Sequence, residues 1–477
     1  MTAQTILPAN TLSSGGYQVD NSARFDDGSS DSLTKSLGTP TSTKIGTFSC
    51  WVKLANVTTE QTMLGAYADS SNRHHIEFQA DHNIEIFGKA SNSVNMNLIT
   101  NAFFRDVSAW YHIVVAFDTT QGTAANRVKL YVNGTQVTSF ATETYPGQNT
   151  VLQFNTDGST IAVGRNQGGN YADGYMCEVA FIDGQQLAAD QFGEFDEDSG
   201  IWKPIDVSGL TFGDEGFYLE FKEAGTSANA SGIGADTSGN TGHFTVNNLT
   251  AVDQSLDTCT NNFVTINSLD TFYTSSTLSD GNLTLTGGST HAANTATIGL
   301  DKGKWYWETR VNSWQSANNS SVGITSQSPT ATNYEYYNVE GNIIGYGYYS
   351  GGSVYGAGST LASSYGSASG THIIGVALDL DNNKIAWSYD GTFQGSANPV
   401  NGANMISITA PSSLLTGLYF PAWSQKTGNK IHNINFGSPP FAISSTQADD
   451  DGHGNFEYDV PAGYFALCSK NLAEYGG

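Results

Sequence analysis

Charged side chains are scarce in this 477-residue chain: only 13% of residues are Asp, Glu, Lys or Arg, about half of the usual share. Basic residues are the scarcer kind, with 19 Lys and Arg against 44 Asp and Glu, so the formal net charge is −25. A surface of this sign repels nucleic acid and anionic membranes, and neither is expected as a partner. Solubility explains most of this charge; a basic partner or bound divalent cations are the alternatives.

Cysteines and long apolar runs are rare as well. Cys50, Cys177, Cys259 and Cys468 lie far apart and form no CxxC pair, which argues against a zinc knuckle and against a disulfide framework. No apolar run reaches 18 residues, so no membrane span is expected. The N-terminus lacks the charged and apolar regions of a signal peptide, and synthesis in a cytoplasm is therefore expected.

The chain is instead rich in glycine, with 53 residues, and in aromatic residues, at 12%. The stretch 372–395, HIIGVALDLDNNKIAWSYDGTFQG, contains two runs in which apolar residues alternate with others. Strict alternation predicts half-buried strands, and Asn382-Asn383 and Asp390-Gly391 are turn dipeptides that tolerate positive φ. Such runs recur along the chain, so the predicted fold class is all-β, with two tandem antiparallel β-sandwiches.

The first half contains a specific series of strand signals. These are Phe48–Lys53, Trp110–Asp118, Lys129–Val137 around Asn133-Gly134, Ile161–Asn166 and Gly174–Leu187. The series resembles the laminin-G-like, concanavalin A-type jelly roll. We expect this domain to span residues 17–255 and to include two late segments, Phe217–Lys222 and Phe244–Leu249, as strands that return to the same sandwich. Within the domain, Ala188–Phe195 is the best candidate for a helix.

The second half repeats the pattern with different motifs. KGKWYWETRV, SVGI, the 372–391 meander, LYFPAWS and INFGSPPF occur in the order typical of a SPRY (B30.2-type) domain, and this resemblance covers residues 270–441. Residues 256–269 are expected to form a linker. Residues 1–16 are polar and read as an arm or anchor, and the tail 442–477 is expected to dock a strand back onto a domain.

The combination of these domains with a DTxTNNF-type segment and a GYFALxxxNL-type tail resembles virion appendage proteins of tailed, especially marine, bacteriophages. The resemblance implies a non-enzymatic structural protein of the capsid or tail, such as a fibre or decoration. It would be made in the host cytoplasm, assembled on the particle surface as a homo-oligomer and bound to other virion proteins through the arm. Its sandwiches would display recognition surfaces for host-surface glycan or protein. The alternatives are a polysaccharide-degrading virion enzyme and a ligand-free capsid cement protein.

Catalytic motifs give no support to the enzyme alternative. No ExDxxE pattern of paired strand carboxylates and no GxSxG nucleophile elbow occurs. The acidic run 194–198 comes nearest and is interpreted as a solvated loop. We therefore expect no catalytic residues and no organic cofactor.

Calcium is the ion that the resemblance favours, because laminin-G-like domains often bind it at a sandwich edge and calcium prefers several oxygen ligands from loops. Candidate ligands are Asp26, Asp27, Asp173, Asp236 and Asn240, with Asp31 nearby. The competing interpretation is that these side chains only close turns. His74 and His75, as adjacent strand residues, point to opposite faces and cannot easily share a metal; with His82 they are expected at the surface of a hairpin.

Tyrosines crowd residues 333–365 among glycine and serine. Tyrosine offers rigid amphipathic contact area, so a ligand-binding surface is one hypothesis and ordinary sheet packing is the other. The candidate contacts are Tyr334, Tyr336, Tyr337, Tyr349, Tyr355 and Tyr365.

Overall fold

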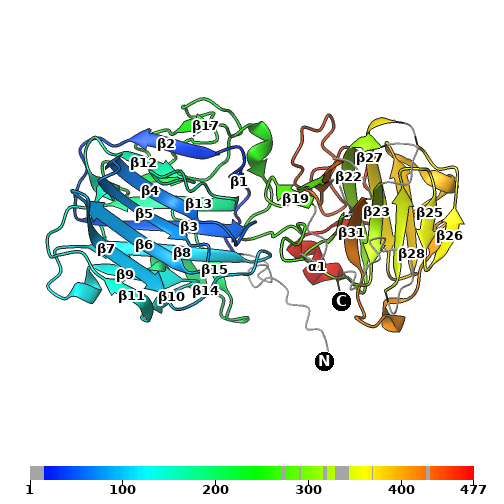
Figure 1. Cartoon of the computed structure of the whole chain (residues 1–477), viewed down its shortest axis with the longest axis horizontal. Helices are drawn as coiled ribbons and strands as arrows, with labels where there is room; N and C mark the ends of the chain where they lie inside the picture. Colours follow the sequence, from blue (N-terminus) through cyan, green and yellow to red (C-terminus); the bar gives the residue numbers. More distant parts are fainter. Residues whose placement is uncertain are drawn as a thin grey trace. The chain divides into compact units, whose positions relative to one another are not determined.

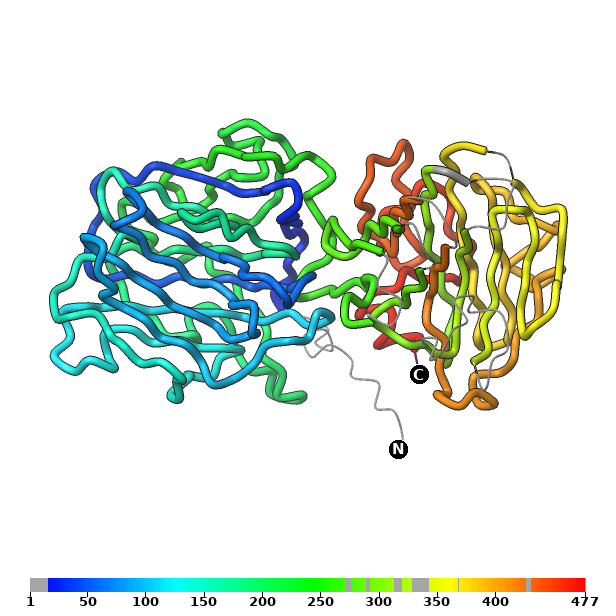
Figure 2. The backbone as a smooth tube through the Cα atoms, viewed as in Figure 1, coloured from blue at the N-terminus to red at the C-terminus, as the bar shows by residue number. Residues whose placement is uncertain are grey.

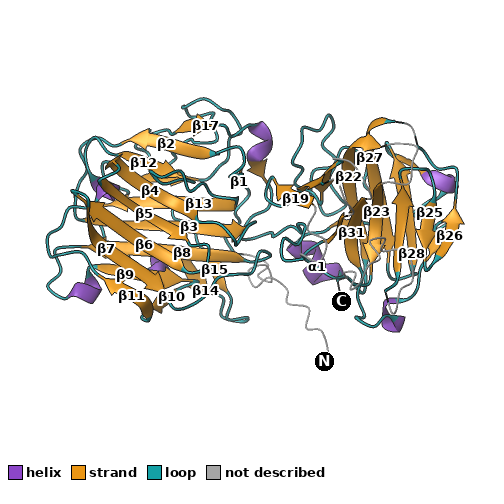
Figure 3. Cartoon of the chain, in the orientation of Figure 1, coloured by secondary structure: helices purple, strands orange, loops and turns teal. Residues whose placement is uncertain are grey.

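The computed structural model describes residues 16–270, 276–288, 292–314, 320–327, 343–367, 369–425 and 430–476. The expected arm at residues 1–16 lies outside this part of the chain apart from Gly16, and so do Tyr334, Tyr336 and Tyr337. The described residues divide into a first compact unit up to Asn261 and a second from Asn262 onward. Strands dominate both units (Figure 3).

The first unit contains two large antiparallel sheets and a two-stranded one (Figure 1). The first large sheet contains, in order, β10 (Thr135–Val137), β9 (Val128–Val132), β8 (Trp110–Asp118), β3 (Ile45–Leu54), β13 (Gly174–Asp183), β1 (Ser22–Phe25) and β18 (Gln254–Ser255), with β16 (Phe217–Leu219) also paired to β13. The second contains β11 (Phe140–Thr144), β7 (Ser93–Thr100), β6 (Ile84–Ala90), β5 (Asn72–Phe78), β4 (Gln61–Asp69), β12 (Thr160–Val163), β2 (Ser32–Ser36) and β17 (Thr245–Asn247). The small sheet pairs β14 (Gly193–Phe195) with β15 (Trp202–Pro204).

The core of the first unit is formed by the alternating apolar residues of both sheets. Phe48, Cys50 and Val52 of β3 belong to one buried cluster with Ile76 of β5 and Ile86 of β6. Successive side chains of a strand point to opposite faces, so the residues between them, such as Trp51, lie on the other face and join a second buried cluster. The unit is an antiparallel β-sandwich of the expected fold class.

The two late segments lie in this same unit. Strand β16 pairs with β13 through Phe217 opposite Phe181, and β17 pairs with β2. In Figure 2 the green backbone of this region runs beside the dark blue backbone of β2. Strands separated by about two hundred residues therefore share a sheet.

The boundary between the two units lies inside residues 256–269, the expected linker, although much of this segment is buried rather than exposed. The Ser22 hydroxyl donates to the Asp257 carbonyl oxygen at 2.6 Å, and the Val19 amide donates to Thr260 Oγ1 at 3.0 Å, so its first part is built into the first unit. Val264 and Ile266 are fully buried in the core of the second unit. The segment is rich in small and polar residues, which in a sequence are typical of an exposed loop. Here most of them are buried, so their burial could not be predicted.

The second unit contains two further sheets, again antiparallel except for one edge pairing. The larger has the order β19 (Ser276–Ser279), β20 (Thr284–Gly287), β32 (Ile431–Asn435), β22 (Lys304–Trp314), β27 (Gly370–Asp379), β28 (Lys384–Tyr389) and β29 (Thr392–Phe393), with β30 (Ile406–Ser407) on β28 and β33 (Phe465–Ala466) on β22. The smaller has β21 (Ala292–Thr295), β31 (Phe420–Gln425), β23 (Ser320–Thr325), β24 (Gly345–Tyr349), β25 (Val354–Gly356) and β26 (Ser359–Ala362). Trp305, Trp307, Trp387 and Trp423 anchor its core.

The tail packs within the second unit, though not mainly as a strand. Its one named strand, β33, pairs in parallel with β22, isolated bridges join Phe263 to Cys468 and Gln447 to Phe456, and the chain continues into α1 (Ser469–Tyr475). Leu467 and Leu472 are buried in the same core as the tryptophans. The expected docking strand is thus a two-residue strand followed by a short helix.

Helices are few and short in the described part of the chain. Apart from α1 they are single 3-10 turns, at Ala124–Asn126, Gln153–Asn155, Ala189–Gln191, Ala251–Asp253, Gln394–Ser396 and Pro411–Ser413. The helix expected over Ala188–Phe195 is only the third of these turns, followed by β14. No helix among the described residues has the length and apolarity that crossing a membrane requires.

Candidate functional site

Two loops of the first unit meet where β1 ends and β13 begins. Phe25, the last residue of β1, is opposite Gly174, the first residue of β13. The residues just outside this pair are Asp26 and Asp173, which the register therefore brings together. Carboxylate oxygens of Asp26, Asp27 and Asp173 all lie within 4.8 Å of one another. Three of the five predicted calcium ligands thus form one cluster.

The carboxylates are held by backbone and side-chain contacts. The Asp173 amide donates to Gln61 Oε1 at 3.1 Å, and the Gly28 amide donates to Asp26 Oδ1 at 3.0 Å. The neighbouring Asp31 accepts from the Asp26 amide at 3.0 Å and from the Ser29 hydroxyl at 2.7 Å. Burial raises the pKa of Asp31 to about 6. Asp31 therefore shapes the 26–31 turn and is not part of the three-carboxylate cluster.

The donor set of this cluster fits a hard cation. It consists only of carboxylate oxygens, which calcium prefers, and calcium takes six to eight oxygen ligands. Asp173 is buried, whereas Asp26 and Asp27 are half-buried, so solvent or a ligand can complete the coordination. Asp26, Asp27 and Asp173 are the residues that would hold the ion.

The other two predicted ligands close a separate turn. Asp236 Oδ1 accepts from the amides of Tyr218 and Ser238, each at 3.0 Å, and Oδ2 accepts from the Gly242 amide at 3.0 Å. The Asn240 side chain donates to the carbonyl oxygens of Gly213 and Gly216. The turn-closing interpretation holds for Asp236 and Asn240, because their oxygen and amide groups are used by the backbone.

The described tyrosines of the second unit pack in or against its sheets. Tyr349 is 4% exposed and meets Tyr355 edge-on at 5.0 Å between ring centroids. Tyr365 is half-buried and packs edge-on against Tyr348 at 5.5 Å. Tyr349 is therefore a packing residue rather than a surface contact, and the half-buried Tyr355 and Tyr365 present only part of their rings.

A polar cavity of the first unit has no counterpart among the predicted sites. It has a volume of about 270 Å³, and its lining includes Tyr17, Glu178, Asp206, Glu220 and Lys222. Glu178 interrupts the apolar run of β13 at a bulge where the register shifts, and its φ of +52° is unusual for a side chain with a Cβ.

The Glu178 carboxylate accepts hydrogen bonds from the hydroxyl groups of Tyr218 and Tyr17. Burial and, to a smaller extent, nearby Glu220 raise the pKa of Glu178 to about 7, although the tyrosine hydrogen bonds oppose the shift. A glutamate inside the near-continuous apolar run GYMCEVAFI was the signal that could have indicated this cavity.

Comparison with known proteins agrees with the fold of the first unit. Residues 26–190 match the concanavalin A-like lectin/glucanases superfamily, and no curated protein sequence matches the chain. Similar solved structures include a native heptameric SAP-like pentraxin from Limulus polyphemus, with 14% identity, coverage of 36% of this chain and 80% of that chain, and a TM-score of 0.28. The SPRY domain of human HERC1 has 16% identity, coverage of 33% of this chain and 91% of that chain, and a TM-score of 0.24. Domains LG4-5 of the mouse laminin alpha1 chain have 9% identity, coverage of 98% of this chain and 91% of that chain, and a TM-score of 0.29.

The sheets and the family match together define the class of the first unit. It is a concanavalin A-like jelly roll, and the Asp26–Asp27–Asp173 cluster lies at one end of the β1–β13 pair.

Proposed function

We propose that this protein is a non-enzymatic bacteriophage virion protein whose first unit binds a host-surface glycan through calcium. The observation that carries the proposal is the cluster of Asp26, Asp27 and Asp173 within a concanavalin A-like jelly roll. Three monodentate aspartates leave several positions of a calcium ion open. Vicinal sugar hydroxyls supply oxygen ligands of the same kind, so a glycan can complete the coordination without any change in the protein.

The virion assignment rests on the domain order and on the DTxTNNF-type and GYFALxxxNL-type segments. Many copies on one particle would make weak binding at each site sufficient, because linked sites bind with a high effective concentration.

The polysaccharide-degrading alternative has one observation in its favour. Glu77 and Glu85 are directly opposite each other on β5 and β6, which brings together two carboxyl groups, as glycoside hydrolysis requires. However, their side chains are only 3% and 10% exposed, and the His75 ring lies 3.5 Å from both. A sugar ring does not fit between these two carboxylates, so the pair does not favour hydrolysis.

The buried Ser49–His112 pair does not favour nucleophilic catalysis. His112 Nδ1 accepts a hydrogen bond from the Trp202 indole at 2.9 Å, and burial lowers the pKa of His112 to about 3. The neutral ring then carries its proton on Nε2 and donates it to Ser49 Oγ, 2.9 Å away. In this tautomer the imidazole cannot take the serine proton.

The test is a glycan array of host-envelope material, probed with the full chain in calcium and in chelator, together with an assay for released reducing sugar. Calcium-dependent binding without sugar release supports the proposal. Clear sugar release contradicts the non-enzymatic part. Silence on the array together with loss of particle stability when the chain is deleted favours the cement alternative. Imaging of intact particles with the chain labelled tests the virion assignment.

A further inference from the structure

A second group of possible metal ligands lies on the second sheet of the first unit, away from the calcium candidates in sequence. His75 and Glu77 are two residues apart on β5, so they share one face of the sheet. Glu85 on β6 is directly opposite Glu77. The intervening Ile76 and Ile86 point into the core, so the three polar side chains are on the opposite face.

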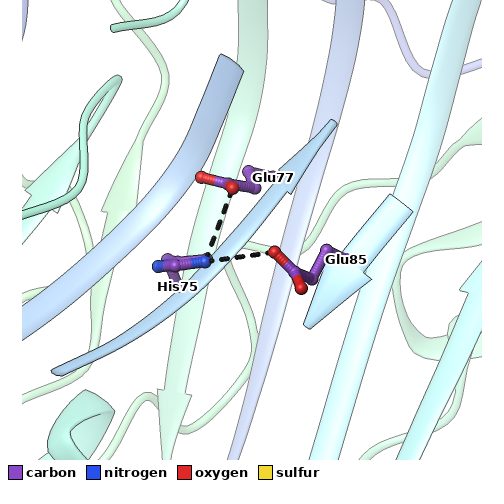
Figure 4. A group of neighbouring side chains, drawn as sticks. All are labelled: His75, Glu77 and Glu85. Carbon is purple, nitrogen blue, oxygen red and sulfur yellow. Dashed lines mark ion pairs between the residues drawn. The ribbon is translucent and has the colours of Figure 1, made fainter. Parts of the chain in front are cut away.

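The histidine points into this group but makes no hydrogen bond (Figure 4). His75 is 6% exposed, and neither ring nitrogen has a hydrogen-bond partner. Its Nε2 lies 3.5 Å from Glu77 Oε1 and 3.5 Å from Glu85 Oε2. A charged hydrogen bond between these groups would be about 2.7–2.9 Å long. The three groups converge at a separation that direct hydrogen bonding does not explain.

The two separations from His75 Nε2 match a shared metal ion, and the three ligand atoms all lie within 4.8 Å of one another. Zinc binds histidine nitrogen and carboxylate oxygen at about 2.0–2.1 Å in a tetrahedron, whose edges are then about 3.3 Å. We propose that His75, Glu77 and Glu85 bind one zinc-type divalent cation through His75 Nε2 and one oxygen of each glutamate. The fourth position, toward the slightly exposed Glu85, is left for water or a ligand.

Neighbouring residues orient the ligands as they do around metal ions. Glu77 Oε2 accepts hydrogen bonds from Thr62 Oγ1 at 3.0 Å and from Asn166 Nδ2 at 2.9 Å, which leaves Oε1 directed at His75. The Phe87 ring stacks on the His75 ring at 5.0 Å and fixes its plane. Such outer contacts position metal ligands and tune their affinity.

Electrostatics favour a cation at this point. Two glutamates directly opposite on neighbouring strands repel each other, and both are buried. The nearest arginine on the same strand, Arg73, lies over the Phe87 ring and donates to Gln167 Oε1. A divalent ion offsets both carboxylates, and the imidazole nitrogen selects zinc, cobalt or nickel over calcium and magnesium.

The inference does not depend on the proposed glycan function, and it is tested on the chelator-treated full chain. Titration with cobalt chloride, followed by zinc sulfate, is monitored by visible absorption and by bound metal per chain. We expect one equivalent of bound metal, the intense absorption of tetrahedral Co²⁺, and its loss when zinc displaces cobalt. A wild-type chain that binds neither metal, or gives only the weak octahedral spectrum, overturns the proposal.

Variants assign the site. His75→Ala and Glu85→Gln are each expected to weaken zinc binding at least ~100-fold, and Asn166→Ala, which removes an orienting contact, about 10-fold. The matched control is His372→Ala, since His372 also lies beside a carboxylate, with Nδ1 2.8 Å from Asp390 Oδ2. Asp173→Asn is expected to retain zinc, which separates this site from the calcium cluster.

Unchanged affinity in both His75→Ala and Glu85→Gln, with unfolding temperatures near that of the wild type, contradicts the assignment. If either variant fails to fold, the wild-type Co²⁺ spectrum and the Asn166→Ala affinity decide.

Discussion

Lys53 and Asp257 form a buried ion pair in the first unit, with Lys53 Nζ 2.7 Å from Asp257 Oδ2 and both side chains at most 2% exposed. The Trp110 indole donates to the other carboxylate oxygen at 3.2 Å. Burial lowers the pKa of Lys53, and Asp257 opposes this shift. The pair attaches the segment that follows β18 to strand β3, on the face of the sheet that carries Trp51 and Tyr175.

Removing Asp257 is expected to destabilise the first unit strongly. Asp257→Ala leaves the Lys53 charge buried and unpaired, and breaking a buried pair in this way costs about 3–5 kcal/mol. Denaturant unfolding of the full chain measures the loss in the first unit. Glu194→Gln is the control, because Glu194 pairs with Lys203 while 58% exposed, and such pairs contribute about 0–1 kcal/mol. Equal effects of the two substitutions would contradict the anchoring role.

Calcium binding is expected to depend on Asp173 and not on Asp236. Asp173→Asn removes one charged ligand from the cluster. Calorimetric titration should therefore show either no heat of calcium binding or an affinity for calcium at least ~10-fold lower than that of the wild type. Asp236→Asn should keep the affinity but lower the unfolding temperature, because a buried backbone amide loses its acceptor at a cost of about 1–3 kcal/mol. No heat and no thermal shift with the wild-type chain would remove the calcium proposal.

Glu178 should make the first unit less stable as pH rises. Its pKa is about 7 in the folded chain against an ordinary value of 4.5, so between these values the folded state binds more protons than the unfolded state, and stability falls with increasing pH. Glu178→Gln has no such titration. The stability of the variant relative to wild type should therefore increase by about 3 kcal/mol from pH 4 to pH 8. Denaturant unfolding at both pH values measures it, and a constant difference would contradict the shifted pKa.

The second unit should require residues that precede residue 270. A fragment 262–477 is expected to fold, whereas 270–477 lacks Phe263, Val264 and Ile266, which are 3%, 1% and 0% exposed. Their burial contributes about 1.5–3 kcal/mol each, which together approaches the whole stability of a typical domain. Circular dichroism and thermal unfolding of the two fragments compare them, and similar melting curves would show that the 262–269 segment is dispensable.

The same unit should also require the tail. A fragment 262–441 lacks Tyr464, Leu467 and Cys468, each fully buried, and exposes one side of β22 where β33 pairs. We expect it to aggregate or to melt far below 262–477. A soluble, cooperatively folded 262–441 fragment would contradict this.

Local patterns predicted the strands well because alternation and turn chemistry act between near neighbours. The run from Trp110 became β8, and Asn133-Gly134 adopts the positive φ values, +47° and +76°, that such a hairpin turn needs. Asp26 and Asp173 were selected because acidic loop residues suit calcium, and Asp173 directly precedes the strand predicted from Gly174. The pairing of β1 with β13, which brings Asp26 and Asp173 together, was not predicted.

Features that depend on distant partners were missed. In the sequence, Asp257 and Ile266 are typical of loop residues, because the distant segments of the same chain that cover them cannot be seen there. His74, His75 and His82 were expected at a surface, but His74 and His75 are buried in β5 and only His82 lies in the turn. The proposed metal ligands did leave a signal in the sequence, because a hairpin centred on Asp81 places Glu77 opposite Glu85, on the face of His75.

Strands β17 and β18 pair with β2 and β1, which the ribosome synthesises much earlier. A nascent chain emerges from the ribosome with the first two strands long before the segments that pair with their outer edges. Until residues 245–255 have emerged, the backbone of β2 presents unpaired amides and carbonyls, which are templates for pairing with another chain. Translation that stops early would therefore release a sandwich with an open edge, and chaperones or rapid completion of the chain would be needed to keep such molecules apart.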